Sequence, residues 1–327
     1  MKKSDIGIAL YLLAAVIFFI VPISSTLLDV MLAINISVAL IVLFNTLFVQ
    51  EVLDMSFFPT LLLFTTIFRI SLNVSSTRLI LTTGNPGNVV ETFGQFVGGG
   101  NMIIGAIIFV VLILIQFIVI NKGSERVAEV TARFTLDAMP GKQMAIDADL
   151  NTGAITEKQA RERRNKIQEE ASFFGSMDGA TKYVKGDATA GLIITFINII
   201  GGTAMGMMRD GLQFADAIQR YGLLTIGDGL CSQIPSLLIS LATGILVTKA
   251  SKEADFSNIL ISQLFGIPKV LYIVGATLCF LGIVTPLKTY LFVPLGLVFV
   301  IAGRSVSKNS AIESIEEEAN EAEAEAE

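Results

Sequence analysis

Long apolar runs separated by short polar turns make up most of this sequence. Eight of them are close to the roughly 20 residues that a helix needs to cross a bilayer. They lie at residues 6–22, 27–49, 56–81, 102–120, 188–208, 222–248, 269–286 and 288–303. We therefore predict an all-α, polytopic membrane protein with about eight transmembrane helices, four within residues 1–121 and four within residues 188–304.

Some stretches depart from this simple pattern. The first run follows Met1-Lys2-Lys3 as a signal peptide would, but it lacks a small-residue cleavage site, so we expect a retained helix. Arg69 and Arg78 interrupt the third run, which leaves open a shorter span followed by an amphipathic stretch at the interface. The Gly-rich segment Gly84–Asn101 is expected to be a turn-rich connection, with a re-entrant course left open. Thr285-Pro286-Leu287 is expected to be a tight hairpin turn.

The one sizeable polar region covers residues 122–187. It holds 11 basic and 11 acidic residues. Thr156-Glu157-Lys158-Gln159 has the form of a capping box, which predicts a helix from there to about Phe174. We expect this region to form a small α-rich cytoplasmic subdomain between the fourth and fifth transmembrane helices.

Charge distribution indicates an orientation in the membrane. The net charge of −6 comes from residues 305–327, which we expect to be an acidic, low-complexity tail or linker. With eight spans and a cytoplasmic N-terminus, 18 of the 23 Lys and Arg residues fall in segments predicted to be cytoplasmic. Because cytoplasmic loops carry an excess of these residues, we predict that both termini are cytoplasmic.

The composition excludes several classes of chemistry. The chain has no histidine, which excludes His-dependent triads and His-ligated metals. Cys231 and Cys279 lie in separate apolar runs and are predicted to be packed thiols. We expect no enzyme activity, no cofactor, no metal site and no nucleic-acid partner.

Two motif-like stretches in the polar region fail at required positions. Gly141-Lys142 lacks the upstream glycine and the following Ser or Thr of a phosphate-binding loop. Asp147-x-Asp149-x-Asn151 opens like a calcium loop, but Thr152 and Lys158 stand where Gly and Glu are required. Asx-turns that lead into the next helix explain these carboxylates as well.

Acidic residues at membrane depth are the clearest candidates for function. Asp228 lies in the sixth run, where an ionisable group costs roughly 2.5–3.5 kcal/mol on insertion scales. Two interpretations stay open: a carboxylate that exchanges protons, or a structural partner of an arginine such as Arg69. Asp187 begins the fifth run, and by itself this position favours a helix N-cap. Asp178 and Lys182 are four residues apart and are predicted to face each other as an ordinary helix-surface pair.

Other polar or small residues within the apolar runs indicate tight helix packing. Asn35, Asn45, Gln116 and Asn198 are expected to form hydrogen bonds between helices. Gly202-x-x-x-Gly206 permits close approach of a neighbouring helix. These residues favour a packed or oligomeric bundle and say little about function.

Several stretches together resemble one known family. The run Arg126–Asp149 reads RVAEVTARFTLDAMPGKQMAIDAD and resembles the signature of the FHIPEP family, the large export-gate proteins of bacterial flagellar and type III secretion systems. Residues Arg69–Arg78, Gly175–Asp187 and Ile226–Pro235 resemble the same family. The resemblance covers the chain in order, from its start to about residue 305.

The resemblance carries expectations about assembly and activity. It implies a multi-pass protein of the bacterial inner membrane, arranged as a homo-oligomeric, nonameric ring. It also implies other membrane export-gate proteins and the export ATPase complex as partners, and unfolded flagellar proteins exported with the help of the proton motive force. Members carry a large cytoplasmic domain after the last helix, where this sequence has its acidic segment; a fragment and a shortened paralogue are both left open.

The resemblance also implies roles for individual residues. Asp187 would be the principal proton-coupling carboxylate, supported by Asp178, Lys182, Asp228, Arg69 and Arg78. Residues of the assembly and coupling loop would be Arg126, Glu129, Arg133, Asp137, Pro140, Gly141, Lys142, Asp147 and Asp149. Two alternatives remain: a virulence-type (injectisome) paralogue, and a structural scaffold of the export ring without ion coupling. A small-solute transporter would be expected to show an internal repeat, and none is evident.

Overall fold

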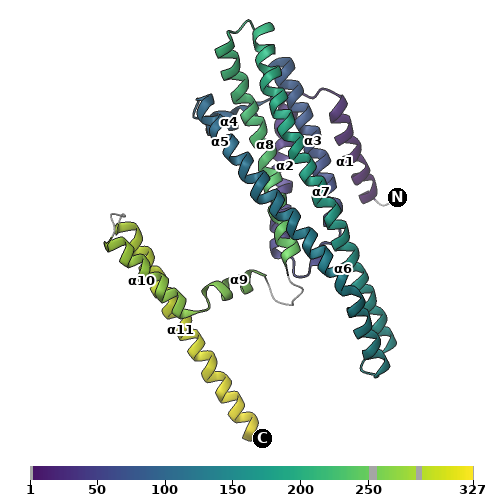
Figure 1. The fold of residues 1–327 in the computed structure, drawn as a ribbon, viewed down its shortest axis with the longest axis vertical. Helices are drawn as coiled ribbons and strands as arrows, with labels where there is room; N and C mark the ends of the chain where they lie inside the picture. Colours follow the sequence, from purple (N-terminus) through teal and green to yellow (C-terminus); the bar gives the residue numbers. More distant parts are fainter. Residues whose placement is uncertain (1–2, 250–255, 285–288, 327) are drawn as a thin grey trace. The chain divides into compact units, whose positions relative to one another are not determined.

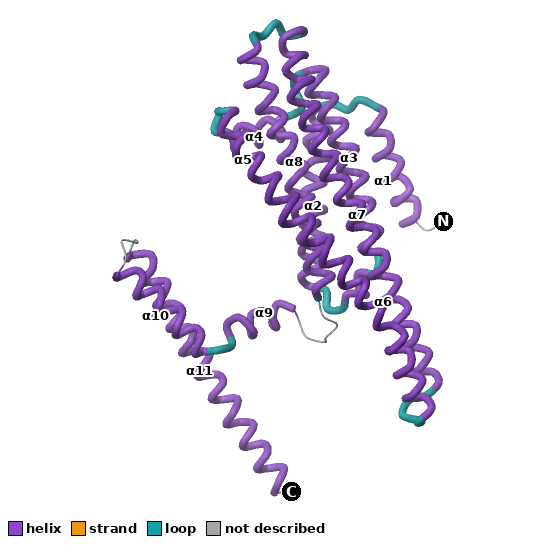
Figure 2. Tube along the Cα trace, viewed as in Figure 1, coloured by secondary structure: helices purple, strands orange, loops and turns teal. Residues whose placement is uncertain are grey.

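The computed structural model describes residues 3–249, 256–284 and 289–326, and these ranges contain helices and no strand. The chain forms two compact units, residues 1–252 and residues 253–327. Figures 1 and 2 show the helices of each unit. Those of the first unit are α1 (Lys3–Ile20), α2 (Ser25–Phe48), α3 (Phe58–Thr83), α4 (Asn88–Gly98), α5 (Met102–Leu114), α6 (Lys122–Asn151), α7 (Glu157–Met208) and α8 (Phe214–Thr248). A 3₁₀ turn, η1 (Val52–Met55), precedes α3, and a π-helical segment, η2 (Ile115–Asn121), joins α5 to α6.

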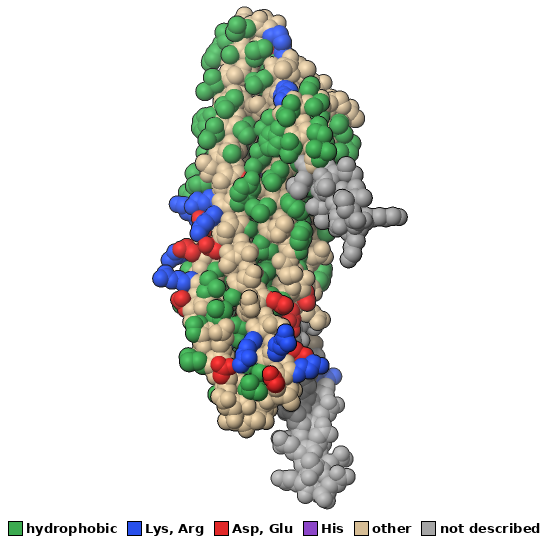
Figure 3. Space-filling model, turned by 90° about the vertical axis from the view of Figure 1, so that its right-hand side faces the viewer, with side chains coloured by type: hydrophobic (Ala, Val, Ile, Leu, Met, Phe, Trp, Pro, Cys, Tyr) green, Lys and Arg blue, Asp and Glu red, His purple; other side chains and the backbone are tan. Residues whose placement is uncertain are grey.

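Every predicted span falls on a helix. By length and composition, six helices in the described ranges can cross a membrane: α2, η1 with α3, α5 to α6, α7, α8 and the first part of α11. The other two predicted spans lie on α1, with 18 residues, and on α10, with 17. In Figure 3 hydrophobic side chains cover the upper part of the view, and charged side chains gather lower down, toward the α6–α7 end. The prediction of a helical, polytopic membrane protein is confirmed.

The third span and the Gly-rich segment differ from what we expected. Helix α3 runs unbroken for 26 residues with Arg69 buried inside it, so the alternative of a short span plus an interfacial stretch is wrong. The Gly-rich segment contains helix α4 and is not a simple turn-rich connection. Asp29, on α2, accepts hydrogen bonds from the backbone N–H groups of Asn88 (2.9 Å) and Val89 (3.0 Å). A carboxylate at this position satisfies unpaired donors and opposes the positive end of the helix dipole, which stabilises α4.

The polar region 122–187 forms a helical hairpin. Helix α6 takes up the first 30 residues of this region and contains Pro140. The first part of α7 forms the second arm of the hairpin. The capping box is confirmed: the Thr156 hydroxyl accepts from the Gln159 N–H, and the Gln159 side chain accepts from the Thr156 N–H. The helix that begins there does not end near Phe174, because Phe173, Phe174 and Met177 pack into the bundle core and the helix continues to Met208.

Ion pairs hold the two arms of the hairpin together. Lys142 contacts Glu170 at 2.8 Å, and Asp149 contacts Arg163 at 3.1 Å. A third pair joins Asp147 to Arg164 at 2.5 Å. All three pairs are partly solvent-exposed, so each contributes little, about 0.2–1 kcal/mol. Their common effect is to set the register of α6 against α7.

Three basic side chains cap the C-terminal ends of helices. Arg78 donates to the carbonyl oxygens of Phe19 (2.9 Å) and Ile20 (3.0 Å) at the end of α1. Lys249 donates to the carbonyls of Leu47 and Val49 at the end of α2. Arg209 donates to Leu81 and Thr82 at the end of α3. A cation at this position satisfies free carbonyls and complements the negative end of the helix dipole.

Helices α7 and α8 pack closely through small residues. A methyl group built on Gly202 or on Gly206 would lie 2.6 Å from a ring carbon of Tyr221, so the Tyr221 ring occupies the space that the two glycines leave. The predicted close approach at this motif is confirmed. Asn198, on the same helix, is fully buried. Cys231 is buried, and both it and Cys279 are free thiols, as predicted.

The second unit contains α9 (Phe256–Phe265), α10 (Pro268–Val284) and α11 (Thr289–Ala326). Helix α10 packs along α11: a methyl group on Gly275 would lie 2.7 Å from the carbonyl oxygen of Gly296. The predicted turn at residues 285–287 lies outside the described residues. Helix α11 continues through the acidic segment to Ala326, where we had expected a low-complexity tail or linker.

Candidate functional site

A buried ion pair joins the middles of two helices. Arg69 on α3 and Asp187 on α7 are in direct contact, and their side chains are 3% and 4% exposed. The second carboxylate oxygen of Asp187, Oδ1, is buried and has no hydrogen-bond partner among the described residues. The same holds for Nε of Arg69. The pair thus satisfies its charges and leaves one acceptor and one donor free for a further ligand.

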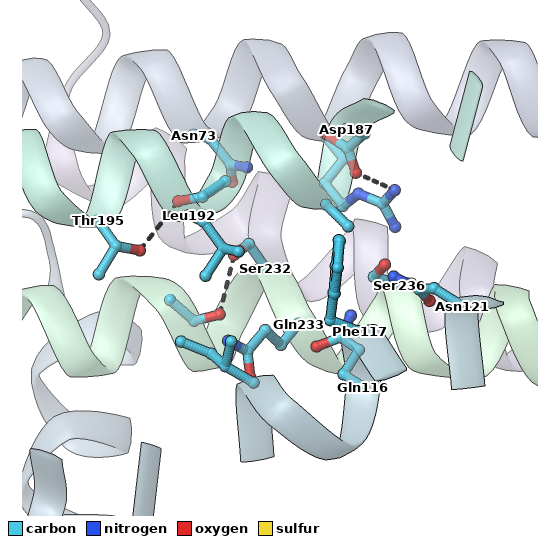
Figure 4. A pocket seen from close by; sticks show the side chains of 15 residues that line it. Asn73, Gln116, Phe117, Asn121, Asp187, Leu192, Thr195, Ser232, Gln233 and Ser236 are labelled. Atoms are coloured by element: carbon cyan, nitrogen blue, oxygen red, sulfur yellow. Dashed lines mark hydrogen bonds and ion pairs between the residues drawn. The ribbon is translucent and has the colours of Figure 1, made fainter. Parts of the chain in front are cut away.

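A polar cavity lies against this pair (Figure 4). The space open to the centre of a water molecule is about 40 Å³. Since one water needs roughly 10–15 Å³ on this measure, the cavity has room for a few. Its polar lining comes from four elements: Asn73 on α3, Gln116 and Asn121 on η2, Thr195 on α7, and Ser232, Gln233 and Ser236 on α8.

The π-helical segment η2 aims two of these side chains at the cavity. In an α-helix, residues five apart point about 140° away from each other. A π-helix, with its i to i+5 hydrogen bonds, brings such residues onto one face. Gln116 and Asn121 are five apart, both are buried, and both line the cavity. The backbone N–H of Lys122 donates to the Phe117 carbonyl, which continues the π pattern to the end of the segment.

Asp228 forms a second buried polar contact. It lies on α8 and is 6% exposed. The side-chain amide of Asn198, on α7, donates to its Oδ2 at 3.1 Å. The Oδ1 of Asn198 has no partner among the described residues. Asp228 therefore links α7 to α8, whereas the Arg69–Asp187 pair links α3 to α7.

Two of our interpretations of these carboxylates are corrected. Asp187 is not a helix N-cap: it lies inside α7, whose N-cap is Thr156. The cap reading failed because the polar hairpin and the fifth span form one helix. Arg69 is not the partner of Asp228, because its guanidinium contacts Asp187. Asp228 takes a neutral amide partner instead.

The remaining residues grouped with Asp187 lie away from it. Asp178 and Lys182 form the predicted i, i+4 pair at 2.8 Å, with Lys182 exposed and Asp178 half-buried, and this prediction is confirmed. Asp178 precedes Asp187 by nine residues on the same helix, a rise of about 14 Å. Arg78 caps α1 and does not contact the carboxylates. The structure thus brings Arg69 and Asp187 together and leaves Asp178, Lys182 and Arg78 outside the contact.

The residues of the assembly and coupling loop all lie on α6. Arg126 pairs with Glu129 at 2.8 Å. Lys142, Asp147 and Asp149 form the pairs to α7 described above, so the two carboxylates lie within a helix and not in Asx-turns. Every member of the set except Asp149 is exposed, including Arg133, Asp137, Pro140 and Gly141. No group of three or more His, Cys, Asp or Glu side chains able to hold a metal occurs in the described part of the chain.

Sequence reasoning missed several polar residues of the site. Asn73, Asn121, Ser232 and Ser236 were not singled out, although all four line the cavity. Asn73 lies one helical turn from Arg69, and Ser232 and Ser236 follow Asp228 at intervals of four. Their spacing from the charged residues was the available signal, because residues four apart share a helix face.

A family model and several known proteins are similar to this chain. The model of the FHIPEP family matches residues 15–327. The chain is 52% identical to the flagellar biosynthesis protein FlhA of Bacillus subtilis, over 94% of this chain and 46% of that protein. It is 47% identical to FlhA of Salmonella typhimurium, over 87% of this chain and 43% of that protein.

One further relative carries a different name. The low calcium response locus protein D of Yersinia pestis is 46% identical to the chain, over 95% of this chain and 44% of that protein. The chain thus spans less than half the length of these relatives. No solved structure matches it. Since the family model covers nearly the whole chain and agrees with the helical, polytopic fold, this protein belongs to the FHIPEP family.

Proposed function

We propose that this chain is the membrane part of an export gate in the flagellar type III protein export apparatus, and that it couples the proton motive force to protein translocation. The observation that carries the proposal is the Arg69–Asp187 pair, buried within the helix bundle with a free carboxylate oxygen beside a polar cavity. The flagellar branch is favoured over the injectisome branch by the identity to FlhA of Bacillus subtilis.

Protonation of Asp187 would change the balance of forces between α3 and α7. When Asp187 is ionised, it compensates the buried charge of Arg69. A proton on Oδ1 removes that compensation, and an uncompensated buried charge costs about 3–5 kcal/mol. A membrane potential of 100 mV supplies about 2.3 kcal/mol per proton. The two energies are of the same order, so passage of a proton can shift α3 against α7 between two arrangements.

Helix α7 provides the mechanical link to the polar end. It runs without interruption from Glu157 to Met208 and carries Asp187 within it. Thirty residues separate Glu157 from Asp187, a length of about 45 Å. A tilt or shift of α7 at Asp187 would therefore move the α6–α7 hairpin, which we place in the cytoplasm together with both termini. The hairpin is the part that we expect to face other export components.

The assembly implied by the family is part of this proposal. We propose a homo-oligomeric, nonameric ring in the inner membrane that works with other membrane export-gate proteins and the export ATPase complex. Its substrates would be unfolded exported proteins. The chain itself would perform no enzymatic reaction; its contribution is the movement of protons and of helices.

The test is protein export in cells that carry variants of the gene encoding this chain. Asp187→Asn should abolish secretion of flagellar proteins while the protein still accumulates in the membrane. Glu162→Gln is the matched control, because it neutralises an exposed carboxylate on the same helix. Normal secretion with Asp187→Asn would refute the proposal.

A structural scaffold is the second candidate. The burial of the ion pair favours it, because a buried pair can also fix the arrangement of helices. It predicts that Asp187→Asn reduces assembly of the ring in native gels after detergent extraction. Loss of secretion with intact assembly separates ion coupling from this alternative.

A further inference from the structure

A second, smaller cavity adjoins the first. Asn121 lines both, and the second is otherwise lined by residues toward the α6–α7 hairpin, among them Ser124, Glu125, Lys185 and Ser240. Its space open to the centre of a water molecule is about 10 Å³, close to the minimum for one water. The two cavities therefore follow one another along the bundle and meet at Asn121.

Unpartnered polar atoms are concentrated at this meeting point. Besides Asp187 Oδ1 and Arg69 Nε, the side-chain Nδ2 of Asn121 and the hydroxyl of Ser236 are buried without a partner among the described residues. All four residues line the first cavity. The set contains two N–H donors, one carboxylate acceptor and one hydroxyl. Water both donates and accepts, so it satisfies all of them, whereas a bare cation would be repelled by the donors.

We propose that ordered water fills both cavities and, hydrogen-bonded to Asn121 where the cavities meet, forms a continuous proton path between Asp187 and the Glu125–Lys185 pair. This inference rests on the proposed function, because it supplies the route by which Asp187 exchanges its proton with one side of the membrane. In the transfer, the O–H bond of protonated Asp187 breaks as a neighbouring water gains that proton. Each water passes one of its own protons onward, and the last is released at the outer end, so charge is conserved.

Asn121 is held in the orientation that this path requires. The hydroxyl of Ser240, on α8, donates to Oδ1 of Asn121 at 3.0 Å. That bond occupies Oδ1 and leaves the Nδ2 donor free for water. The hydroxyl of Ser124 donates to the Ser240 carbonyl at 2.9 Å and fixes the start of α6 against α8. The π-helical segment completes the arrangement by placing Asn121 on the same face as Gln116.

The outer end of the path reaches solvent. Lys185 and Glu125 are in contact at 2.9 Å, and their side chains are 40% and 18% exposed. Lys185 precedes Asp187 by two residues on α7, and Glu125, on α6, follows Asn121 by four residues. It can therefore exchange protons or water with the bulk, in contrast to the buried pair at the inner end.

Hydroxyl-radical labelling tests the waters directly, because X-ray pulses turn bound water into radicals that oxidise adjacent side chains. The test uses the full-length protein in vesicles. Phe117 lines the first cavity, whereas Phe109 is buried in an apolar cluster. We expect labelling of Phe117 in the wild type, a marked loss of that labelling in Asn121→Leu, and no change at Phe109. Unchanged Phe117 labelling in Asn121→Leu overturns the inference.

Proton flux into the same vesicles provides the functional readout. Asn121→Leu should slow the flux about tenfold, a barrier increase of about 1.4 kcal/mol, close to one lost hydrogen bond. Ser240→Ala should slow it in the same direction without adding bulk. Thr225→Val is the matched control, since the Thr225 hydroxyl is buried on α8, lines neither cavity and, among the described residues, bonds to the Tyr221 carbonyl of its own helix.

The two proposals fail in different ways. If Asp187→Asn stops the flux while Asn121→Leu and Ser240→Ala leave it at the wild-type rate, the water path is wrong and the proposed function stands. If Asp187→Asn leaves the flux unchanged, the proposed function is wrong and the proton path falls with it.

Discussion

Arg69 and Asp187 lie 118 positions apart in the sequence, yet their side chains form one ion pair in which neither is more than 4% exposed. Each sits within a long helix, so the pair fixes α3 against α7 at one register. Its burial makes the pair sensitive to any change in charge. Because the free Oδ1 of Asp187 lies beside the polar cavity, a proton that changes this charge can reach it from the cavity.

Removing the charge of Asp187 should destabilise the bundle. In Asp187→Asn the buried guanidinium of Arg69 loses its counter-charge, which costs about 3–5 kcal/mol. Glu162→Gln neutralises a carboxylate in an exposed pair on the same helix and should cost only about 0.2–1 kcal/mol. Thermal unfolding in detergent, followed by circular dichroism, compares the two. Equal losses would mean that the Arg69–Asp187 pair is not desolvated as described.

Gly227 should tolerate no side chain. A methyl group there would collide with the backbone carbonyl of Val90, because α4 and α8 touch at this point. We expect Gly227→Ala to lower stability by about 1–3 kcal/mol, the usual range for overpacking a core. Gly179, on α7, has open space around its Cα, so Gly179→Ala should be neutral or stabilising by up to about 1 kcal/mol. A stable Gly227→Ala variant would contradict the close contact of α4 with α8.

We expect Asp210, in the connection between α7 and α8, to make the stability of the protein depend on pH in the acid range. Hydrogen bonds from Arg209 and then from Tyr221 lower the pKa of Asp210 to about 2. Because this pKa lies below the value of about 3.9 in an unfolded chain, the contact contributes stability above pH 4 and loses it as the pH falls toward 2. We expect the melting temperatures of the wild type and Asp210→Asn to differ at neutral pH and to converge near pH 2. A difference that persists at pH 2 would show that the carboxylate is not the group responsible.

Reversing both charges of an ion pair between the two arms of the hairpin should preserve the contact. Asp147→Arg places two cations together at the contact with Arg164 and should loosen the hairpin tip, seen as faster proteolysis. Adding Arg164→Asp restores opposite charges and should restore protection. Because the pair is exposed, both effects should weaken at high salt. Failure of the double variant to recover would show that Asp147 acts through another contact.

The membrane-spanning architecture could be predicted from the sequence because it depends on local properties. A run of apolar residues of sufficient length specifies a helix that spans the bilayer, whatever its neighbours are. The capping box at Thr156 and the Asp178–Lys182 pair are local for the same reason. Each depends on residues no more than four positions apart.

The partners of the buried carboxylates could not be predicted, since they depend on how distant helices pack. Asp187 meets Arg69 only because α7 continues from the polar hairpin into the bundle and lies against α3 in one register. Asp29 appeared unremarkable within the second run, and its role follows from the position of the α4 N-terminus. The π-helical turn at Gln116 and Asn121 leaves no periodic signal in so short and apolar a stretch.

Proton flux through reconstituted protein tests the central claim most directly. The full-length wild type and Asp187→Asn would be placed in vesicles that contain a pH-sensitive dye, and a membrane potential would be imposed. We predict acidification with the wild type, and none with Asp187→Asn at equal amounts of inserted protein. Equal acidification by the two proteins would contradict the assignment of Asp187 as the proton-coupling carboxylate.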